Sequence, residues 1–272
     1  MRSIAAFALG IGLTACSQDT PGVKGPTGIY AGGPDGGAPG RGAPEGGPSE
    51  GGGPGAGGPG PKTGAHILAQ RNINGSSNTP LVTSPVSTQT SGSTIIVSVG
   101  RGDSSGLASL PTDNMGNTPY AKLGSNVAFV NYPGSGAALY DFIGATGGAG
   151  HTFAANMVGS DEVTIIVVEV KNGHVIQDAK GSYVGPGTLT SPSVTTTGPA
   201  TIVAFCWGDN GAGTTIRSVN NSFQLLDQYM ATNGLSVQGA SASLDVTAPG
   251  SYNVTWTVDS PQGAILFIVA VQ

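Results

Sequence analysis

The chain has few of the residue types on which catalysis, metal binding and helix formation usually depend. Only 9% of its 272 residues are charged and 6% are aromatic, and it has three His and two Cys. A net charge of -5 and a pI near 4.9 argue against nucleic acid as a partner, because phosphate binding needs a basic surface. No segment keeps the period of an amphipathic helix, and no apolar run reaches the ~18 residues of a membrane span.

Glycine and proline, by contrast, are abundant and are concentrated near the N-terminus. Residues 21–64 hold 19 of the 47 Gly and 9 of the 19 Pro, with an irregular spacing that excludes a collagen repeat. Such a segment cannot bury enough apolar surface to offset its chain entropy. We therefore expect a disordered Gly/Pro-rich tether over residues 16–65. The remaining residues, 66–272, are enough for one full-sized core.

The first sixteen residues have the order of a secretory signal. Arg2 precedes an apolar run over residues 4–13, and Leu13-Thr14-Ala15-Cys16 closes the segment. These residues resemble the signal of bacterial lipoproteins, with its lipobox. The alternative is an ordinary secretory signal with a chance cysteine.

The resemblance implies that residues 1–15 are removed and that Cys16 carries diacylglycerol. It implies a cell-envelope protein whose membrane contact is the lipid on Cys16. By analogy with lipoprotein sorting in two-membrane bacteria, Ser17 in place of Asp after the cysteine implies the outer membrane or cell surface over the inner membrane. With Cys16 assigned to lipid, Cys206 has no disulfide partner, and its apolar surroundings predict a buried, inert thiol.

From His66 onward, short runs of Val, Ile and Thr alternate with Gly, Asn and Pro, which is typical of β-strands. Asn172-Gly173 and Asn233-Gly234 each separate two such runs, and both predict a hairpin. The segment 259–263 predicts a third hairpin with a longer loop. We expect an all-β domain in which helix is nearly absent.

Alternation along the strands predicts how each one is buried. The run 252–258 alternates, so one of its faces lies on the core, whereas the change of parity within 235–246 predicts a bulge near Gly239. Four runs do not alternate and need cover on both faces: 95–99, 163–168, 202–206 and 265–271. We predict a two-sheet antiparallel sandwich of jelly-roll type, with loops or a second copy of the chain covering these strands.

A second resemblance involves the segment Thr112–Tyr120, which contains Asp-x-x-Gly-Asn-Thr after a strand. Together with Ala138-Leu139-Tyr140 and Gly150-His151-Thr152, it is similar to sandwich domains of secreted bacterial proteins and phage tail proteins. The resemblance implies a fold and an extracellular setting. It supplies no catalytic residues.

Candidate ligand contacts are few. Asp113, Asn114 and Asn117 place oxygen ligands suited to a hard cation on one loop, although Asp and Asn also occupy turns for conformational reasons. Tyr132 and Tyr183 stand at turns, where an exposed ring suits a sugar. No His-x-His or Glu-x-x-His spacing indicates zinc, and no Gly-x-Ser-x-Gly elbow indicates a serine hydrolase. We expect neither a metal nor a cofactor.

These observations predict a lipid-anchored, non-enzymatic β-sandwich that serves in binding or adhesion or as an envelope component, with a polysaccharide or a surface protein as ligand. The alternative is a surface glycan-processing enzyme, which needs two carboxylates about 5 to 10 Å apart across a cleft. Glu169 with Asp141 or Asp161 is the candidate pair. The favoured reading of Glu169 is a solvated strand end paired with Lys171.

Overall fold

The computed structural model describes residues 60–73, 77–210, 216–230, 237–259 and 261–272, all within one compact unit, Gly53–Gln272. Its only helical element in these ranges is a 3-10 turn, η1 (Ser104–Ala108). All the strand pairings are antiparallel, so the all-β prediction is confirmed. The strands are β1 (Lys62–Asn72), β2 (Leu81–Val82), β3 (Ser91–Arg101), β4 (Thr112–Asp113), β5 (Ala121–Lys122), β6 (Val127–Ala128), β7 (Gly136–Thr146), β8 (Phe153–Ala155), β9 (Glu162–Lys171), β10 (Ile176–Val184), β11 (Leu189–Thr190), β12 (Val194–Thr196), β13 (Ala200–Asn210), β14 (Ile216–Val219), β15 (Gln224–Met230), β16 (Val237–Val246), β17 (Gly250–Tyr252), β18 (Thr255–Val258) and β19 (Pro261–Val271).

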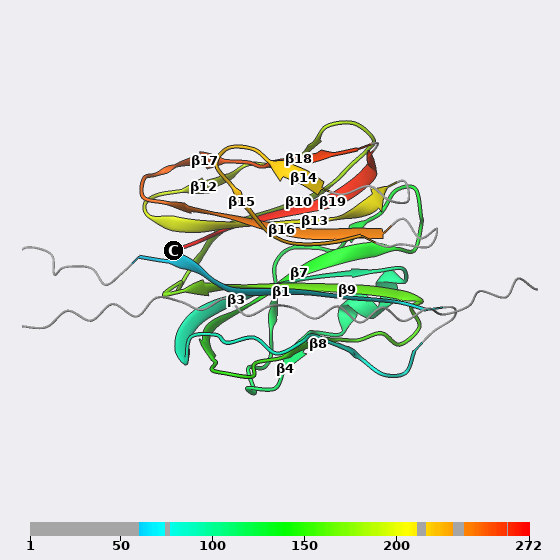
Figure 1. The fold of residues 1–272 in the computed structure, drawn as a ribbon, viewed down its shortest axis with the longest axis horizontal. Helices are drawn as coiled ribbons and strands as arrows, with labels where there is room; N and C mark the ends of the chain where they lie inside the picture. The colour runs from blue at the N-terminus through cyan, green and yellow to red at the C-terminus, as the bar shows by residue number, and fades with distance from the viewer. Residues whose placement is uncertain (1–59, 74–76, 211–215, 231–236, 260) are drawn as a thin grey trace, which may run out of the picture. The chain divides into compact units, whose positions relative to one another are not determined.

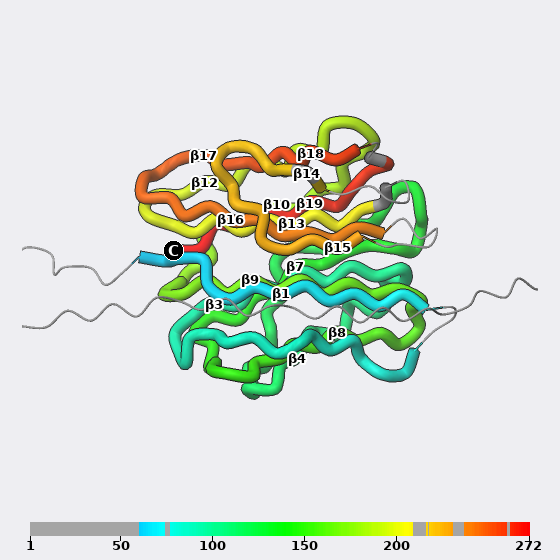
Figure 2. The backbone as a smooth tube through the Cα atoms, viewed as in Figure 1, coloured from blue at the N-terminus to red at the C-terminus, as the bar shows by residue number. Residues whose placement is uncertain are grey.

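Two long sheets face each other across the middle of this unit (Figure 1). The first has the strand order β1-β9-β3-β7-β5, with β6 also paired to β7, and the second has the order β10-β19-β13-β16-β15. Between them lies an apolar core to which Ile166 and Val168 contribute from the first sheet and Phe205 and Phe267 from the second. This central core joins the N-terminal part of the described chain to the C-terminal part, as the colours of the backbone trace show (Figure 2).

Short sheets cover the outer face of each long sheet, which gives four layers (Figure 1). The sheet β2-β8-β4 packs on the first long sheet, while β11-β18-β14 and β12-β17 pack on the second. The sequence predicted one pair of sheets, and the structure has two long sheets and three short ones. The four non-alternating runs are the central strands β3, β9, β13 and β19. Both of their faces are covered by the chain itself, which removes the reason for expecting a second copy.

The two halves of the described chain, 62–171 and 176–271, repeat one topology. The order β1-β9-β3-β7 in the first half corresponds to β10-β19-β13-β16 in the second, and β2-β8-β4 corresponds to β11-β18-β14. The register matches as well, because Thr94 pairs with Val170 and Ile143 as Thr201 pairs with Val271 and Asp245. Each residue of one half therefore has an equivalent position in the other.

Two of the three predicted hairpins are wrong. Asn172 has the expected positive φ of 56°, but β9 and β10 on either side of it lie in different long sheets. The segment 259–263 likewise joins β18 and β19, which do not pair. The strands β15 and β16 do pair, while the Asn233-Gly234 turn between them lies outside the described residues. Turn residues specify a local reversal of the chain, and the choice of partner strand is made by burial.

The bulge predicted near Gly239 lies instead on the neighbouring strand. Pairing of β16 with β13 runs without a shift, whereas the register of β15 against β16 shifts between Leu225 and Asp227. A Cβ at Gly239 would lie 3.0 Å from a methyl carbon of Thr164 on β9. Glycine is needed at this position because the two long sheets approach each other closely there, which also accounts for the change of parity.

Candidate functional site

The loop that carries Asp113, Asn114 and Asn117 is bonded internally. Oδ1 of Asp113 accepts hydrogen bonds from the backbone N–H groups of Met115 (2.9 Å) and Asn117 (3.1 Å). Its Oδ2 accepts from the Asn117 side-chain amide (2.8 Å) and the Tyr120 hydroxyl (2.7 Å). The Asp113 side chain is fully buried. Both carboxylate oxygens of Asp113, which the sequence suggested as cation ligands, therefore accept hydrogen bonds from the protein itself.

The two asparagines fasten this loop to the segment around residues 146–152. Asn117 donates to the Thr146 carbonyl (2.8 Å) and accepts from the Thr146 N–H (2.9 Å). Asn114 donates to the Gly150 carbonyl (2.9 Å) and accepts from the Thr152 N–H (2.8 Å). Each amide thus pairs with backbone as a neighbouring strand would, and neither is arranged around a cation.

His151 extends the same network inward. Its Nε2 lies 3.4 Å from Oδ2 of Asp113, and its Nδ1 lies 2.9 Å from the Thr88 hydroxyl. The order of hydroxyl, imidazole and carboxylate is that of a hydrolytic triad. His151 is completely buried, however, and stacks on Phe153 with ring centroids 4.2 Å apart. A substrate has no access to this hydroxyl, so the network stabilises the fold.

Burial and hydrogen bonding act against each other at Asp113. Burial alone would raise its pKa, but the hydrogen bonds from Tyr120 and Asn117 and the nearby His151 outweigh burial and lower the pKa. The pKa of Tyr120 is raised by burial and by its hydrogen bond to the Asp113 carboxylate. Both directions keep Asp113 ionised and Tyr120 protonated at neutral pH.

The carboxylates proposed for glycan cleavage do not face one another. Glu169 pairs with Ile95, whose side chain lies in the outer core, whereas Asp141 pairs with Ile96, whose side chain lies in the central core. Because paired residues share a face of the sheet, Glu169 and Asp141 point to opposite faces. Asp161 is exposed and precedes β9, while Glu169 lies near the far end of that strand.

Glu169 is also not the solvated strand end that was expected. It is completely buried and accepts hydrogen bonds from the backbone N–H groups of Ala65 (2.9 Å) and Gln89 (2.7 Å). These donors belong to β1 and to the segment before β3. Glu169 therefore secures β1, which begins at Lys62 and so extends before the predicted domain start at His66.

The two predicted tyrosines meet at one aromatic ring. Phe129 lies 5.8 Å from Tyr132 and 5.1 Å from Tyr183 between ring centroids. Tyr132 is 55% exposed, whereas Tyr183 is half-buried and its hydroxyl is buried. Of the two rings, that of Tyr132 is the more accessible to a ligand.

The two cysteines differ in what the structure describes. Cys206 is fully buried, as predicted, and burial raises its pKa to about 12, which disfavours the reactive thiolate. Cys16 lies outside the described residues, as does the tether up to residue 59.

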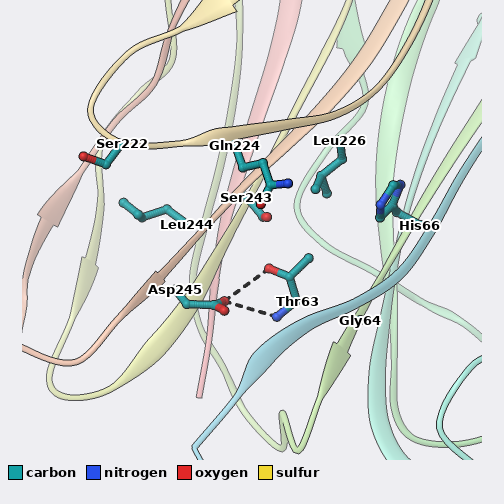
Figure 3. A pocket seen from close by; sticks show the side chains of 9 residues that line it. All are labelled: Thr63, Gly64, His66, Ser222, Gln224, Leu226, Ser243, Leu244 and Asp245. Atoms are coloured by element: carbon teal, nitrogen blue, oxygen red, sulfur yellow. Dashed lines mark hydrogen bonds between the residues drawn. The ribbon is translucent and has the colours of Figure 1, made fainter. Parts of the chain in front are cut away.

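An open groove lies where the edge strand β1 of the first long sheet meets β15 and β16 of the second (Figure 3). We call it the seam groove; its volume is about 370 Å³, and its lining is Thr63, Gly64, His66, Ser222, Gln224, Leu226, Ser243, Leu244 and Asp245. Most of these side chains are polar. The sequence analysis missed them because β1 is distant in the chain from the β15 and β16 segment that it meets.

Two polar contacts hold the walls of the seam groove together. Oδ1 of Asp245 accepts from the Thr63 N–H (3.1 Å) and the Thr63 hydroxyl (3.2 Å) (Figure 3). It also accepts from the Thr201 hydroxyl (2.7 Å). Beyond them, Nδ1 of His66 lies 2.8 Å from Oδ2 of Asp227. Both contacts tie β1, a strand of the first half, to the second half.

Comparison with known proteins gives no relative, since no family model, curated protein or solved structure matches this chain. In the described ranges no helix is long and apolar enough to cross a membrane. Nor do three His, Cys, Asp or Glu side chains gather there as ligands for a metal ion. The candidate site is therefore defined by its own geometry.

Proposed function

We propose that this chain is a cell-envelope lipoprotein that displays a non-enzymatic β-domain for binding. The lipobox Leu13-Thr14-Ala15-Cys16 supports the anchor. Two or more acyl chains hold a protein stably on a membrane, so a diacylated Cys16 needs no spanning helix. The domain would then stand at the end of a Gly/Pro-rich tether on the outer membrane or cell surface.

We also propose that each half of the described chain is a jelly roll. In both halves the first and last strands are neighbours in the long sheet, and the short sheet opposite contains the second and penultimate strands together with β4 or β14. This order supports two Greek keys per half. The finer fold assignment agrees with a display role, since sandwiches of this kind often carry binding surfaces on their loops and edges.

The seam groove is the observation that carries the binding proposal. The polar groups of Asp113, Asn117, His151 and Glu169 are used by the fold, as their burial and hydrogen bonds show. The seam groove, in contrast, leaves polar side chains in an open concave surface of ligand size. Tyr132 adds an exposed aromatic ring elsewhere on the domain.

Binding is tested by applying the full chain, purified in detergent, to an array of glycans and extracellular matrix proteins. We expect concentration-dependent retention on at least one class of spot. Retention on none of them, by a protein whose melting transition shows that it is folded, would contradict the binding role.

The anchor is tested separately with Cys16→Ala. Without a thiol to acylate, the variant should lose palmitate labelling and signal processing at this site. A matched Cys206→Ala variant should keep its label, because the buried thiol is not the acceptor. The lipoprotein assignment is wrong if the Cys16 variant is labelled and pellets with membranes like the unmodified chain.

A further inference from the structure

The two halves meet along two equivalent seams. At the seam groove, β1 of the first half faces β15 and β16 of the second. At the other seam, β10 of the second half faces β6, β7 and the segment 123–126 of the first. A second groove of about 500 Å³ lies at that other seam. The two seams correspond because the halves repeat one topology, but the two grooves lie at different places along them, since the second groove is lined by Leu139 of β7, which corresponds to Ser241.

Corresponding positions in the two seams carry different chemistry. Register makes Asp245 equivalent to Ile143, since each pairs with the equivalent threonine of its half. In the same way Gln224, which pairs with Ser243, corresponds to Ala121, which pairs with Asp141. The fold therefore tolerates apolar side chains at these places. Ser243 corresponds to Asp141 and Asp245 bonds to Thr63 and Thr201, so part of the polar lining serves the fold. The fold does not account for Gln224, and a ligand would.

Hydrogen-bonding capacity remains in the seam groove after the internal bonds are made. All three internal donors to Asp245 reach Oδ1, and within the described residues Oδ2 has no partner. The side chains of Gln224, Ser243 and Ser222 also make no hydrogen bond to other described residues. Figure 3 shows Gln224, Ser243 and Asp245 gathered along one wall of the groove, opposite β1.

The charge and polarity of the groove restrict the ligand class. The carboxylate of Asp245 disfavours an anion, and no set of three metal-binding side chains lies within the described chain. A mostly polar lining disfavours an apolar ligand. A neutral molecule with several hydroxyl groups fits best, because hydroxyls donate to a carboxylate oxygen and accept from amide and hydroxyl groups.

From this chemistry we propose that the seam groove binds a neutral saccharide, with Asp245 as the charged acceptor and Gln224 and Ser243 as further contacts. The proposal rests on the proposed binding function and names its ligand class. One or two sugar rings suit a groove of about 370 Å³, which is at the small end of ligand pockets. The ligand would contact both halves of the domain, since His66 and Thr63 form the opposite wall.

The test uses titration calorimetry of the full chain in detergent, with cellobiose, maltose and chitobiose as neutral probes and digalacturonate as an acidic one. Asp245→Asn keeps an oxygen for Thr63 and Thr201 and replaces the acceptor that faces the groove with a donor. Gln224→Ala introduces the residue found at the equivalent position of the other seam. Gln228→Ala, an exposed position on the same strand outside the groove lining, is the matched control.

We expect at least one neutral disaccharide to bind, and Asp245→Asn to weaken it about 10-fold or more, as loss of a hydrogen bond to a charged group does. Gln224→Ala should weaken it less, and Gln228→Ala should leave it unchanged. Melting temperatures close to that of the unmodified chain show that each variant is folded. These results together support the proposal.

Other outcomes overturn it while leaving the binding function intact. If a neutral disaccharide binds equally well to Asp245→Asn and Gln224→Ala, the groove is not the site. If the chain is retained on array proteins but binds none of the disaccharides, or prefers digalacturonate, the ligand class is wrong. Failure of all array and calorimetric probes would instead contradict the proposed function itself.

Discussion

Asp113 and Asp141, both in the first half, show how the groups around a buried carboxyl determine the direction of its pKa shift. Asp113 accepts hydrogen bonds from Tyr120 and Asn117, and its pKa is lowered. Asp141 is 5% exposed, and burial raises its pKa against a weaker opposing bond from its own backbone. The first carboxylate is stabilised as an anion by its partners, and the second is held in a place that disfavours its charge.

Replacement of Asp141 by Asn should stabilise the protein at neutral pH by about 1 kcal/mol, because it removes a charge that burial disfavours. Because the pKa of Asp141 is raised in the folded state, its protonated form favours folding below the unfolded pKa of about 3.9. This contribution to the free energy of unfolding is lost as the pH rises through the folded pKa. The gain should therefore appear at neutral pH and vanish in acid. Denaturant titrations of both proteins at pH 3 and pH 7 measure it; an equal difference at the two pH values contradicts the assignment.

Asp113→Asn should have the opposite effect and cost about 3 kcal/mol at neutral pH, since its new amide faces the donors of Tyr120 and Asn117. A lowered folded pKa contributes stability above the unfolded pKa, which is lost as pH falls through the folded value. The difference from the unmodified chain should therefore shrink below about pH 3.9. Asn114→Ala, which leaves the Asp113 bonds intact, serves as a control whose effect should not change with pH.

At the scale of elements, the buried Glu169 carboxylate holds β1 where its ladder is interrupted. Glu169 of β9 bonds to Ala65 at the point where the register of β1 shifts between Thr63 and His66. The strand is an edge strand of the first long sheet, paired only with β9. Where the hydrogen-bond ladder between β1 and β9 is interrupted, the Glu169 side chain therefore attaches β1 to β9.

Glu169→Ala should destabilise the domain by about 3 kcal/mol, because two buried backbone N–H groups lose their acceptor. Hydrogen exchange should accelerate most at Ala65 and Gln89. Lys171→Ala, at an exposed position two residues further on, should change stability by less than about 0.5 kcal/mol. If the two variants are equally destabilised, Glu169 acts as a partner of Lys171 after all.

The sequence predicted which strands are buried better than it predicted how they pair. Alternation correctly placed Val254 and Trp256 on a core and marked the central strands as covered on both faces. It could not show that Glu169 is buried, because the N–H groups that satisfy the carboxylate come from segments distant in sequence. The repeat was missed for a similar reason: Thr94-Ile95 and Thr201-Ile202 match too briefly to be noticed without the register.

The seam groove shows the same limit more strongly. Its acceptor, Asp245, is one of many Asp residues near strand ends, and only the packing of two sheets brings it to Thr63. The predicted loop of Asp113 had the stronger local pattern, and that pattern reflected the turn itself.

At the scale of the whole described unit, the central core makes the two halves interdependent. Phe205 and Phe267 of the second half pack with Ile166 and Val168 of the first. Neither half can be removed without exposing this face to water. We expect the repeat to fold as one cooperative unit, although each half has a complete strand order of its own.

Phe267→Ala should destabilise the protein by about 3 to 5 kcal/mol, since Phe267 is 2% exposed in the central core. Hydrogen exchange in denaturant should show the first and second halves losing protection in the same transition. Tyr229→Ala, at an exposed position of β15, should have little effect. Separate transitions for residues 62–171 and 176–271 would show that the halves are independent domains.

The position of β1 has a mechanical consequence. The chain enters the described domain through β1, which runs antiparallel to β9 with ladder hydrogen bonds perpendicular to the strand direction. A pull applied at Lys62 along β1 therefore loads these bonds together in shear, and it also loads the clamp that Glu169 provides at Ala65. If Cys16 is lipidated and the seam groove binds a ligand, as proposed, force between the two would pass through β1 in the direction in which its pairing with β9 resists rupture best.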